Sequence, residues 1–290
     1  MNETVTRMLA KYDIQTPDDA YNVLREIVQE IALYGLWSGG FFKETAFYGG
    51  TALRILYGLD RYSEDMDFTL LASDGEFSFE PYRNKLLESL ETMGFSVEFS
   101  PRKRPSRGKI WSAFLKGNTL NHLLSIGIPR NLIGSRDPRE KVNIKLEVDI
   151  DPAGQFDTEF LPALNPIPYT VRLLTPKCLF AGKMHALLFR AWGERVKGRD
   201  WYDMVWYLQR NIAVYLPYLE AKMRQSGHWT QERNLEKEDV LSIYREKASS
   251  LDMEKAVEDV LDFVKDSKNI EQTWSNHFFL SLDRLFVFEK

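Results

Sequence analysis

The chain has 290 residues, of which 44% are hydrophobic, 28% charged and 13% aromatic, a composition typical of a folded globular protein that excludes a disordered one. Its formal net charge of −4, from 38 basic and 42 acidic residues, argues against a protein that coats nucleic acid nonspecifically. The single cysteine, Cys178, excludes an internal disulfide, and the lack of a membrane-spanning run or a secretory leader predicts a cytoplasmic protein.

Residues 1–45 are predicted to be mostly helical, with the main helix starting after Thr16. Thr16 suits the N-cap, Pro17 suits the first helical position, and two aspartates follow in the first turn. Apolar residues at helical spacing continue to about Trp37, and a glycine pair then ends the helix. The pattern predicts one face packed on a sheet and indicates no chemistry in this helix.

A strand, a turn, a helix and a second strand are predicted between residues 46 and 68. The turn is Gly49-Gly50, which permits a positive φ and a close backbone approach. The free N–H groups of the helix after it favour an anion such as phosphate. In the second strand Asp65 and Asp67 alternate with apolar residues, so both face one side. They either line the wet face of an edge strand or, beside a phosphate site, hold Mg²⁺.

A helix over 80–93 and a strand over 95–99 are predicted next, followed by a basic loop and a strand over 110–115. The loop reads PRKRPSRGK, with Trp111 close behind it. It is either a solvated loop or a contact for the phosphate backbone of RNA, with the tryptophan available to stack on a base. The candidate RNA-binding residues are Arg102, Lys103, Arg104, Arg107 and Lys109.

The clearest strand pattern of the chain is KVNIKLEVDID, residues 141–151. Its apolar residues point to one side, while Lys145, Glu147 and Asp149 point to the other. Such alternation is usually explained by a solvated face.

A stretch with four prolines, residues 151–168, predicts a boundary between a domain of residues 1–160 and a helical domain of residues 161–290. A helix from Pro176 to about residue 191 carries Lys183. Read by itself, Lys183 is an ordinary surface lysine.

The next predicted helix contains Asp200 and Asp203, which are neighbours on one face because they lie three residues apart. Arg199 and Asp203 can form a local ion pair there. The remaining residues, 211–290, are helical by pattern, and their many aromatic residues are expected to form a core.

Two blocks of sequence resemble a known family. The first is GGTALR with RYSEDMDF, residues 49–54 and 61–68, and the second is PKCLFAGKMHALLFR with KGRDWYDMVWYL, residues 176–190 and 197–208. Together they are similar to the AbiEii/AbiGii toxin family of nucleotidyltransferases, within the DNA polymerase β-type superfamily. The resemblance implies an α/β (α+β) fold, with a small mixed sheet flanked by helices and a helical C-terminal domain.

The resemblance also implies roles for particular residues. Asp65 and Asp67 would hold two Mg²⁺ ions together with a third carboxylate, Glu147 or Asp149, of which Glu147 is favoured by its place after Lys145-Leu146. Lys183 and Asp200 would form the other half of the active site. The expected nucleotide-binding residues are Gly49, Gly50, Arg54, Ser63, Lys183, Arg199 and Asp203.

The function implied by the resemblance is that of a toxin of a toxin–antitoxin or phage-defence pair, with a cognate antitoxin, that transfers NMP from an NTP to RNA, with tRNA 3′ ends as the acceptor. One alternative is transfer to a protein hydroxyl or a small molecule. Another is a nucleotide-binding module without catalytic activity.

Overall fold

The computed structural model describes residues 2–102, 109–134, 137–190, 196–264 and 267–290. The chain divides into two compact units. The first consists of Met1–Gly58, Tyr62–Pro152 and Phe160–Leu173, and the second of Leu59–Arg61, Ala153–Glu159 and Leu174–Lys290. Part of the loop that precedes Asp65 therefore belongs to the second unit.

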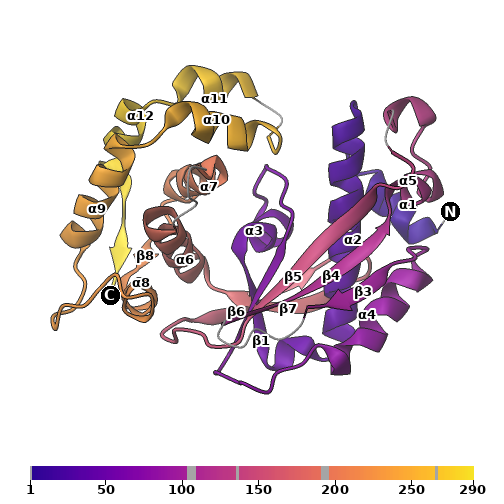
Figure 1. Cartoon of the computed structure of the whole chain (residues 1–290), viewed down its shortest axis with the longest axis horizontal. Helices are drawn as coiled ribbons and strands as arrows, with labels where there is room; N and C mark the ends of the chain where they lie inside the picture. Colours follow the sequence, from indigo (N-terminus) through magenta and orange to yellow (C-terminus); the bar gives the residue numbers. More distant parts are fainter. Residues whose placement is uncertain (1, 103–108, 135–136, 191–195, 265–266) are drawn as a thin grey trace. The chain divides into compact units, whose positions relative to one another are not determined.

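The first unit is built on a seven-stranded mixed sheet with the strand order β3-β4-β5-β2-β1-β7-β6 (Figure 1). Strand β2 pairs in parallel with β5 and antiparallel with β1, while β4 pairs antiparallel with both β3 and β5. The predicted mixed α/β fold is confirmed. The strands are β1 Thr45–Tyr48, β2 Met66–Leu70, β3 Glu98–Pro101, β4 Ile110–Asn118, β5 Lys141–Asp149, β6 Thr158–Ala163 and β7 Tyr169–Leu174.

Helix α2 is the longest described helix of this unit, and its start follows the predicted capping pattern. The Thr16 side chain accepts a hydrogen bond from the backbone of Asp19, and the Asp19 side chain accepts one from the backbone of Thr16. A Cβ at Gly35 would lie 2.8 Å from the Cα of Leu86, so α2 and α4 pack closely there. The helices are α1 Glu3–Leu9, α2 Pro17–Ser38, α3 Gly49–Tyr57, α4 Glu80–Thr92 and α5 Thr119–Ser125, with short 3₁₀ turns η1 Phe41–Lys43 and η2 Arg130–Leu132.

The sheet has a buried side and a part-exposed side in its β4–β5 region. Ala113 and Leu115 on β4 and Leu146 on β5 are almost fully buried, whereas the alternating residues Phe114 and Glu147 are partly exposed. The buried side continues into an aromatic core around Phe68, which makes ring contacts at 5.0 Å with Phe41 and Phe47.

The second unit is mainly helical, as predicted, and is held by aromatic contacts. Phe180 stacks on Tyr207 at 4.5 Å, and Phe279 contacts Trp201 at 4.8 Å. Parallel strands β8 Val214–Tyr215 and β9 Phe288–Glu289 join its C-terminal end to the residues before α8. The helices are α6 Pro176–Phe189, α7 Gly198–Gln209, α8 Leu216–Gln225, α9 Lys237–Ser249, α10 Met253–Leu261, α11 Ser267–Thr273 and α12 Asn276–Ser281, with the 3₁₀ turn η3 Leu282–Leu285.

The proline-containing stretch differs from its predicted irregular form, because β6 lies within it and pairs with β7 at the end of the sheet. Two of its prolines lie in the turn between these strands and one at the end of β6, where a missing N–H costs little on an edge strand. Among the described helices, none has the length and apolarity needed to cross a membrane.

Candidate active site

The glycine turn brings the start of α3 against the carboxylate of Asp67. Gly49 is the first residue of α3 and has a φ of +81°, a value that glycine adopts easily. A Cβ placed at Gly49 would overlap Oδ2 of Asp67. The buried side chain of Thr51 donates a hydrogen bond to the backbone carbonyl of Asp65. The predicted turn and the predicted aspartate strand therefore form one local structure.

The pairing of β2 with β5 places Asp67 directly opposite Glu147. Paired residues of neighbouring strands share a face, so the two carboxylates lie on the same side of the sheet. Asp149 is opposite Thr69, one alternation further along β5. Asp65 directly precedes β2 and is separated from Asp67 by the buried Met66. The register thus distinguishes the two candidates for the third carboxylate.

Both candidates have polar partners. Glu147 accepts a hydrogen bond from the Ser112 hydroxyl at 3.1 Å, and its Oε1 lies 2.7 Å from Nζ of Lys145. Asp149 is buried and accepts the backbone N–H of Asp151 at 3.2 Å. The more exposed carboxylate is therefore the one beside Asp67.

Within the described residues, no three histidine, cysteine, aspartate or glutamate side chains form a group that could hold a metal ion. The acidic side chains that the strand pairing brings together beside the glycine turn are Asp67 and Glu147, and Asp65 directly precedes β2. Hard oxygen donors of this kind fit Mg²⁺ better than softer metals.

Helix α2 contributes to this site, although its sequence pattern indicated no chemistry. Arg54 of the GGTALR motif lies 2.9 Å from Oε2 of Glu26 on α2, and its guanidinium lies 4.7 Å from the centre of the Tyr62 ring. Gln29 on α2 donates to the backbone carbonyls of Ser63 and Glu64 at 3.2 and 2.9 Å. Glu26 and Gln29 therefore hold the two halves of the motif, and no local sequence signal identified them.

A buried cluster of four charged residues forms in the second unit. Nζ of Lys183 on α6 lies 2.6 Å from Asp200 and 2.8 Å from Asp203, both on α7. Arg61 binds the Asp203 carboxylate with two hydrogen bonds of 2.6 Å, in the bidentate geometry that makes such pairs strong. The side chains are almost fully buried, with Lys183 the most exposed at 12%. We call this set, Arg61, Lys183, Asp200 and Asp203, the charge cluster.

The charge cluster keeps its members ionised. Burial alone would lower the pKa of Lys183, but Asp200 and Asp203 outweigh it, so this pKa lies above its usual value. Burial would raise the pKa values of both aspartates, but Lys183 acts on both and Arg61 on Asp203, so both pKa values lie below the usual range. The charges of the two cations, Arg61 and Lys183, and of the two aspartates sum to zero. Oδ2 of Asp200 is buried and has no hydrogen-bond partner among the described residues.

The predicted ion pair between Arg199 and Asp203 is wrong. The partners of Asp203 are Arg61 and Lys183. Nε of Arg199 lies 3.4 Å from Asp259 on α10, and its guanidinium lies 3.8 Å from the centre of the Phe263 ring. Arg61 was missed as a site residue, although it stands at the start of the RYSEDMDF block. Its partner is 142 residues away, which no local pattern could indicate.

The basic loop lies largely outside the described residues, including Lys103, Arg104 and Arg107. Nζ of Lys109 lies 2.8 Å from Asp151. Trp111, which was expected to be available to stack on a base, is half-buried and has ring partners of its own. Its ring contacts those of Phe77 and Phe79, at 5.9 and 5.4 Å, and its Nε1 donates to the backbone carbonyl of Arg102. Trp111 therefore packs on the buried side of the sheet.

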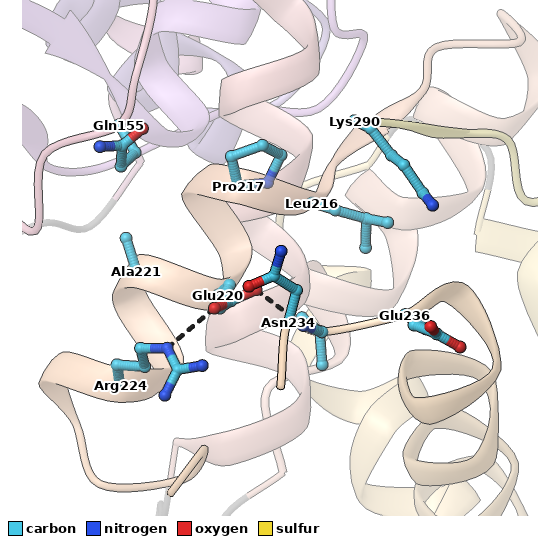
Figure 2. Close-up of a pocket in the computed structure, with 10 residues that line it drawn as sticks. Gln155, Leu216, Pro217, Glu220, Ala221, Arg224, Asn234, Glu236 and Lys290 are labelled. Atoms are coloured by element: carbon cyan, nitrogen blue, oxygen red, sulfur yellow. Dashed lines mark hydrogen bonds and ion pairs between the residues drawn. The ribbon is translucent and has the colours of Figure 1, made fainter. Parts of the chain in front are cut away.

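A pocket of about 470 Å³ in the second unit is lined by none of the predicted site residues. Figure 2 shows Glu220 between Arg224 and Asn234 at its centre. The Glu220 carboxylate accepts hydrogen bonds from Arg224 at 2.8 Å and from the backbone N–H of Leu235 at 2.7 Å. These bonds tie α8 to the segment before α9, so the packing of the unit explains the Glu220–Arg224 pair.

Residues 31–277 match the sequence model of one protein family, which is described as nucleotidyl transferase AbiEii toxin, type IV TA system. The structure is similar to the crystal structure of JHP933 from Helicobacter pylori, with 17% sequence identity, a TM-score of 0.49, and coverage of 91% of this chain and 89% of that chain. It is also similar to a crystal structure of a proposed nucleotidyltransferase from H. pylori, with 17% identity, a TM-score of 0.47, and coverage of 90% and 91%. No curated protein matches the chain.

Proposed function

The chain belongs to the AbiEii nucleotidyltransferase toxin family of type IV toxin–antitoxin systems, and from this premise we propose that it transfers NMP from an NTP to a hydroxyl of RNA in a Mg²⁺-dependent reaction. The family implies the NTP substrate and a cognate antitoxin. The proposed acceptor is the 3′ end of an RNA, with tRNA as the first to test.

The observation that carries this proposal is the arrangement around Gly49. The start of α3 meets the carboxylate of Asp67, and Asp67 lies directly opposite Glu147. The start of α3 favours binding of an anion, and the carboxylates of Asp67 and Glu147 favour binding of a cation. A nucleoside triphosphate with its metal combines both charges, which supports a phosphoryl-transfer site over a simple anion site.

In the proposed reaction, the acceptor oxygen forms a bond to the α-phosphorus of the NTP, and the bond to the β-phosphate breaks to release pyrophosphate. Bound Mg²⁺ would offset the charge on the phosphates and favour ionisation of the acceptor hydroxyl. Asp65, Asp67 and Glu147 would hold it. Glu147 accepts the hydroxyl proton, and we prefer it to Asp149 because only Glu147 is in register with Asp67.

The backbone N–H groups at Gly49 and Gly50, the first residues of α3, are proposed to bind triphosphate oxygens, helped by Ser63. Arg54 is already paired with Glu26, so we propose that it mainly supports the turn. Lys183 is proposed to neutralise phosphate charge and Asp200 to orient it. Arg199 and Asp203 are proposed as supporting residues of that helix.

The test incubates the purified protein with total tRNA, Mg²⁺ and each labelled NTP in turn, beside an Asp67→Asn variant. We expect label in RNA from one preferred NTP, and none with the variant. Label on protein or on a small molecule would support the corresponding alternative transferase. Absence of transfer, together with NTP binding that survives in the variant, would support a nucleotide-binding module instead.

A further inference from the structure

One side of the β3–β4–β5 region carries an aromatic residue among cations, beside the carboxylates. The register places Ser112 of β4 opposite Glu147, Phe114 opposite Lys145 and Lys116 opposite Asn143. These residues alternate with the buried Ala113 and Leu115, so they share the side on which Asp67 and Glu147 lie. We call Arg102, Ser112, Phe114, Lys116, Asn143 and Lys145 the open face.

Phe114 is the centre of the open face. Its ring is partly exposed, with the Arg102 guanidinium 4.9 Å and Nζ of Lys116 5.4 Å from the ring centre. Arg102 is exposed and continues the β3–β4 ladder by donating its backbone N–H to the carbonyl of Ser112. Both cations lie over the ring, so a base that stacks on Phe114 would displace one of them toward the phosphates. An aromatic ring together with cations is the combination with which proteins bind single-stranded nucleic acid.

Phe114 lies close to Glu147, where the terminal hydroxyl of the acceptor is proposed to react. Phe114 lies opposite Lys145, two residues from Glu147, which is about 7 Å along an extended strand. Phe114 is therefore within reach of the nucleotides that follow a terminal hydroxyl placed at Glu147. One acid borders the open face, because Glu98 lies opposite Lys116, and its carboxylate accepts the Ser100 hydroxyl at 2.8 Å.

We propose that the open face binds the single-stranded 3′ end of the RNA acceptor, with a base stacked on Phe114 and the phosphates contacted by Arg102 and Lys116. This inference rests on the proposed function, because it takes Glu147 as the place where the terminal hydroxyl reacts. The open face selects an unpaired end, since the bases of a duplex are stacked on one another and do not reach the ring. Lys145 is paired with Glu147, so we assign it no phosphate contact.

The test measures binding of a short 5′-labelled single-stranded oligoribonucleotide to the intact chain by fluorescence anisotropy, without NTP or Mg²⁺. We expect Phe114→Leu to weaken binding about tenfold, because a base loses its stacking partner. We expect Arg102→Glu and Lys116→Glu to weaken it and to reduce the salt dependence by about 0.7 in log–log slope for each phosphate that the variant no longer binds. Thermal unfolding shows whether each variant is folded.

The matched control is Arg83→Glu, which makes the same change of charge as Arg102→Glu. Arg83 is an exposed residue of α4, and Phe79, which precedes α4, contacts Phe99 and Trp111 on the buried side of the sheet. We expect this variant to bind within about twofold of the unmodified protein, because a charge outside the open face contributes little. An equal loss of affinity for Arg83→Glu and Arg102→Glu would overturn the inference, because net charge alone would then explain the binding.

Two further results separate this inference from the proposed function. If the protein transfers nucleotides to RNA while Phe114→Leu, Arg102→Glu and Lys116→Glu bind and react like the unmodified chain, the open face is not the acceptor site. No measurable binding of the oligoribonucleotide overturns the inference as well. If binding depends on Phe114 but no RNA accepts a nucleotide, the proposed function fails while RNA binding by the open face stands.

Discussion

Asp67 on β2 and Glu147 on β5 lie directly opposite each other in a parallel strand pair, while Asp149 lies opposite Thr69. We therefore expect Glu147→Gln to reduce nucleotidyl transfer at least about 100-fold, the usual effect of removing a general base or metal ligand. Asp149→Asn should reduce it much less. Initial rates at saturating NTP, with the Mg²⁺ concentration varied, measure both effects. A larger loss with Asp149→Asn would identify Asp149 as the third carboxylate.

The glycine turn can be tested with two glycines that both have positive φ. Gly49 has a φ of +81° and no room for a Cβ beside Asp67, whereas Gly58 has a φ of +73° and nothing within 4 Å of a Cβ. Both alanine variants carry the backbone cost of about 1 kcal/mol. Gly49→Ala alone displaces the Asp67 carboxylate, so we expect greater destabilisation and loss of transfer. Urea unfolding and transfer assays of Gly49→Ala and Gly58→Ala check this, and equal effects would contradict it.

The charge cluster predicts that its central aspartate contributes most to stability. Asp203→Ala removes the bidentate carboxylate partner of Arg61 and one of the two carboxylate partners of Lys183, which should cost about 3–5 kcal/mol. Asp200→Ala leaves Lys183 paired with Asp203 and should cost less. Denaturant unfolding of the two variants measures the difference. Equal losses would indicate that the bidentate Arg61 pair adds little.

The same cluster predicts the pH dependence of stability. The pKa values of Asp200 and Asp203 are lowered, so their contribution is present above the unfolded pKa and is lost as pH falls through the folded pKa. The pKa of Lys183 is raised, so its contribution is present below the unfolded pKa and is lost as pH rises through the folded one. We expect Asp203→Ala to remove part of the acid destabilisation below about pH 4. Unfolding curves recorded from about pH 2 to 7 check this.

A buried glutamate on α2, Glu30, is expected to make the protein less stable as the pH rises toward neutral. Glu30 is 8% exposed, its Oε1 accepts a hydrogen bond from Asn165 at 2.8 Å, and its Oε2 has no hydrogen-bond partner among the described residues. Burial raises the pKa of Glu30 from 4.5 to about 7, with Glu26 adding to the rise, while Asn165, Lys11 and Arg54 oppose it. The folded state therefore binds more protons, and stability falls as pH rises from 4.5 through 7.

We expect Glu30→Gln to stabilise the protein by roughly 2–3 kcal/mol at pH 8 and by little at pH 4, because the amide carries no charge to desolvate. Urea unfolding at the two pH values measures the change. Glu91→Gln, at an exposed position of α4, is the control and should change stability little at either pH. A Glu30→Gln effect that is independent of pH would show that ionisation of Glu30 is not its cause.

Much of the fold could be predicted from local chemistry. The capping residues of α2, the positive φ of Gly49 and the alternation in β5 are properties of a few neighbouring residues, and each is found where expected. The strand β6 was missed because its prolines read as a linker, although an edge strand tolerates them. Boundaries differ by a few residues, as with β3, predicted at residues 95–99 and found at Glu98–Pro101.

The sequence by itself determined the glycine turn, the pair Asp65 and Asp67, and the family, because each is a short pattern whose residues are neighbours along the chain. Only the tertiary structure decided that Glu147 rather than Asp149 lies beside Asp67, and that Arg61 pairs with Asp203. The physical reason is that strand register and buried ion pairs depend on how segments distant in sequence pack together. Two side chains on the same face of a strand, such as Glu147 and Asp149, have different neighbours once the partner strand is in place.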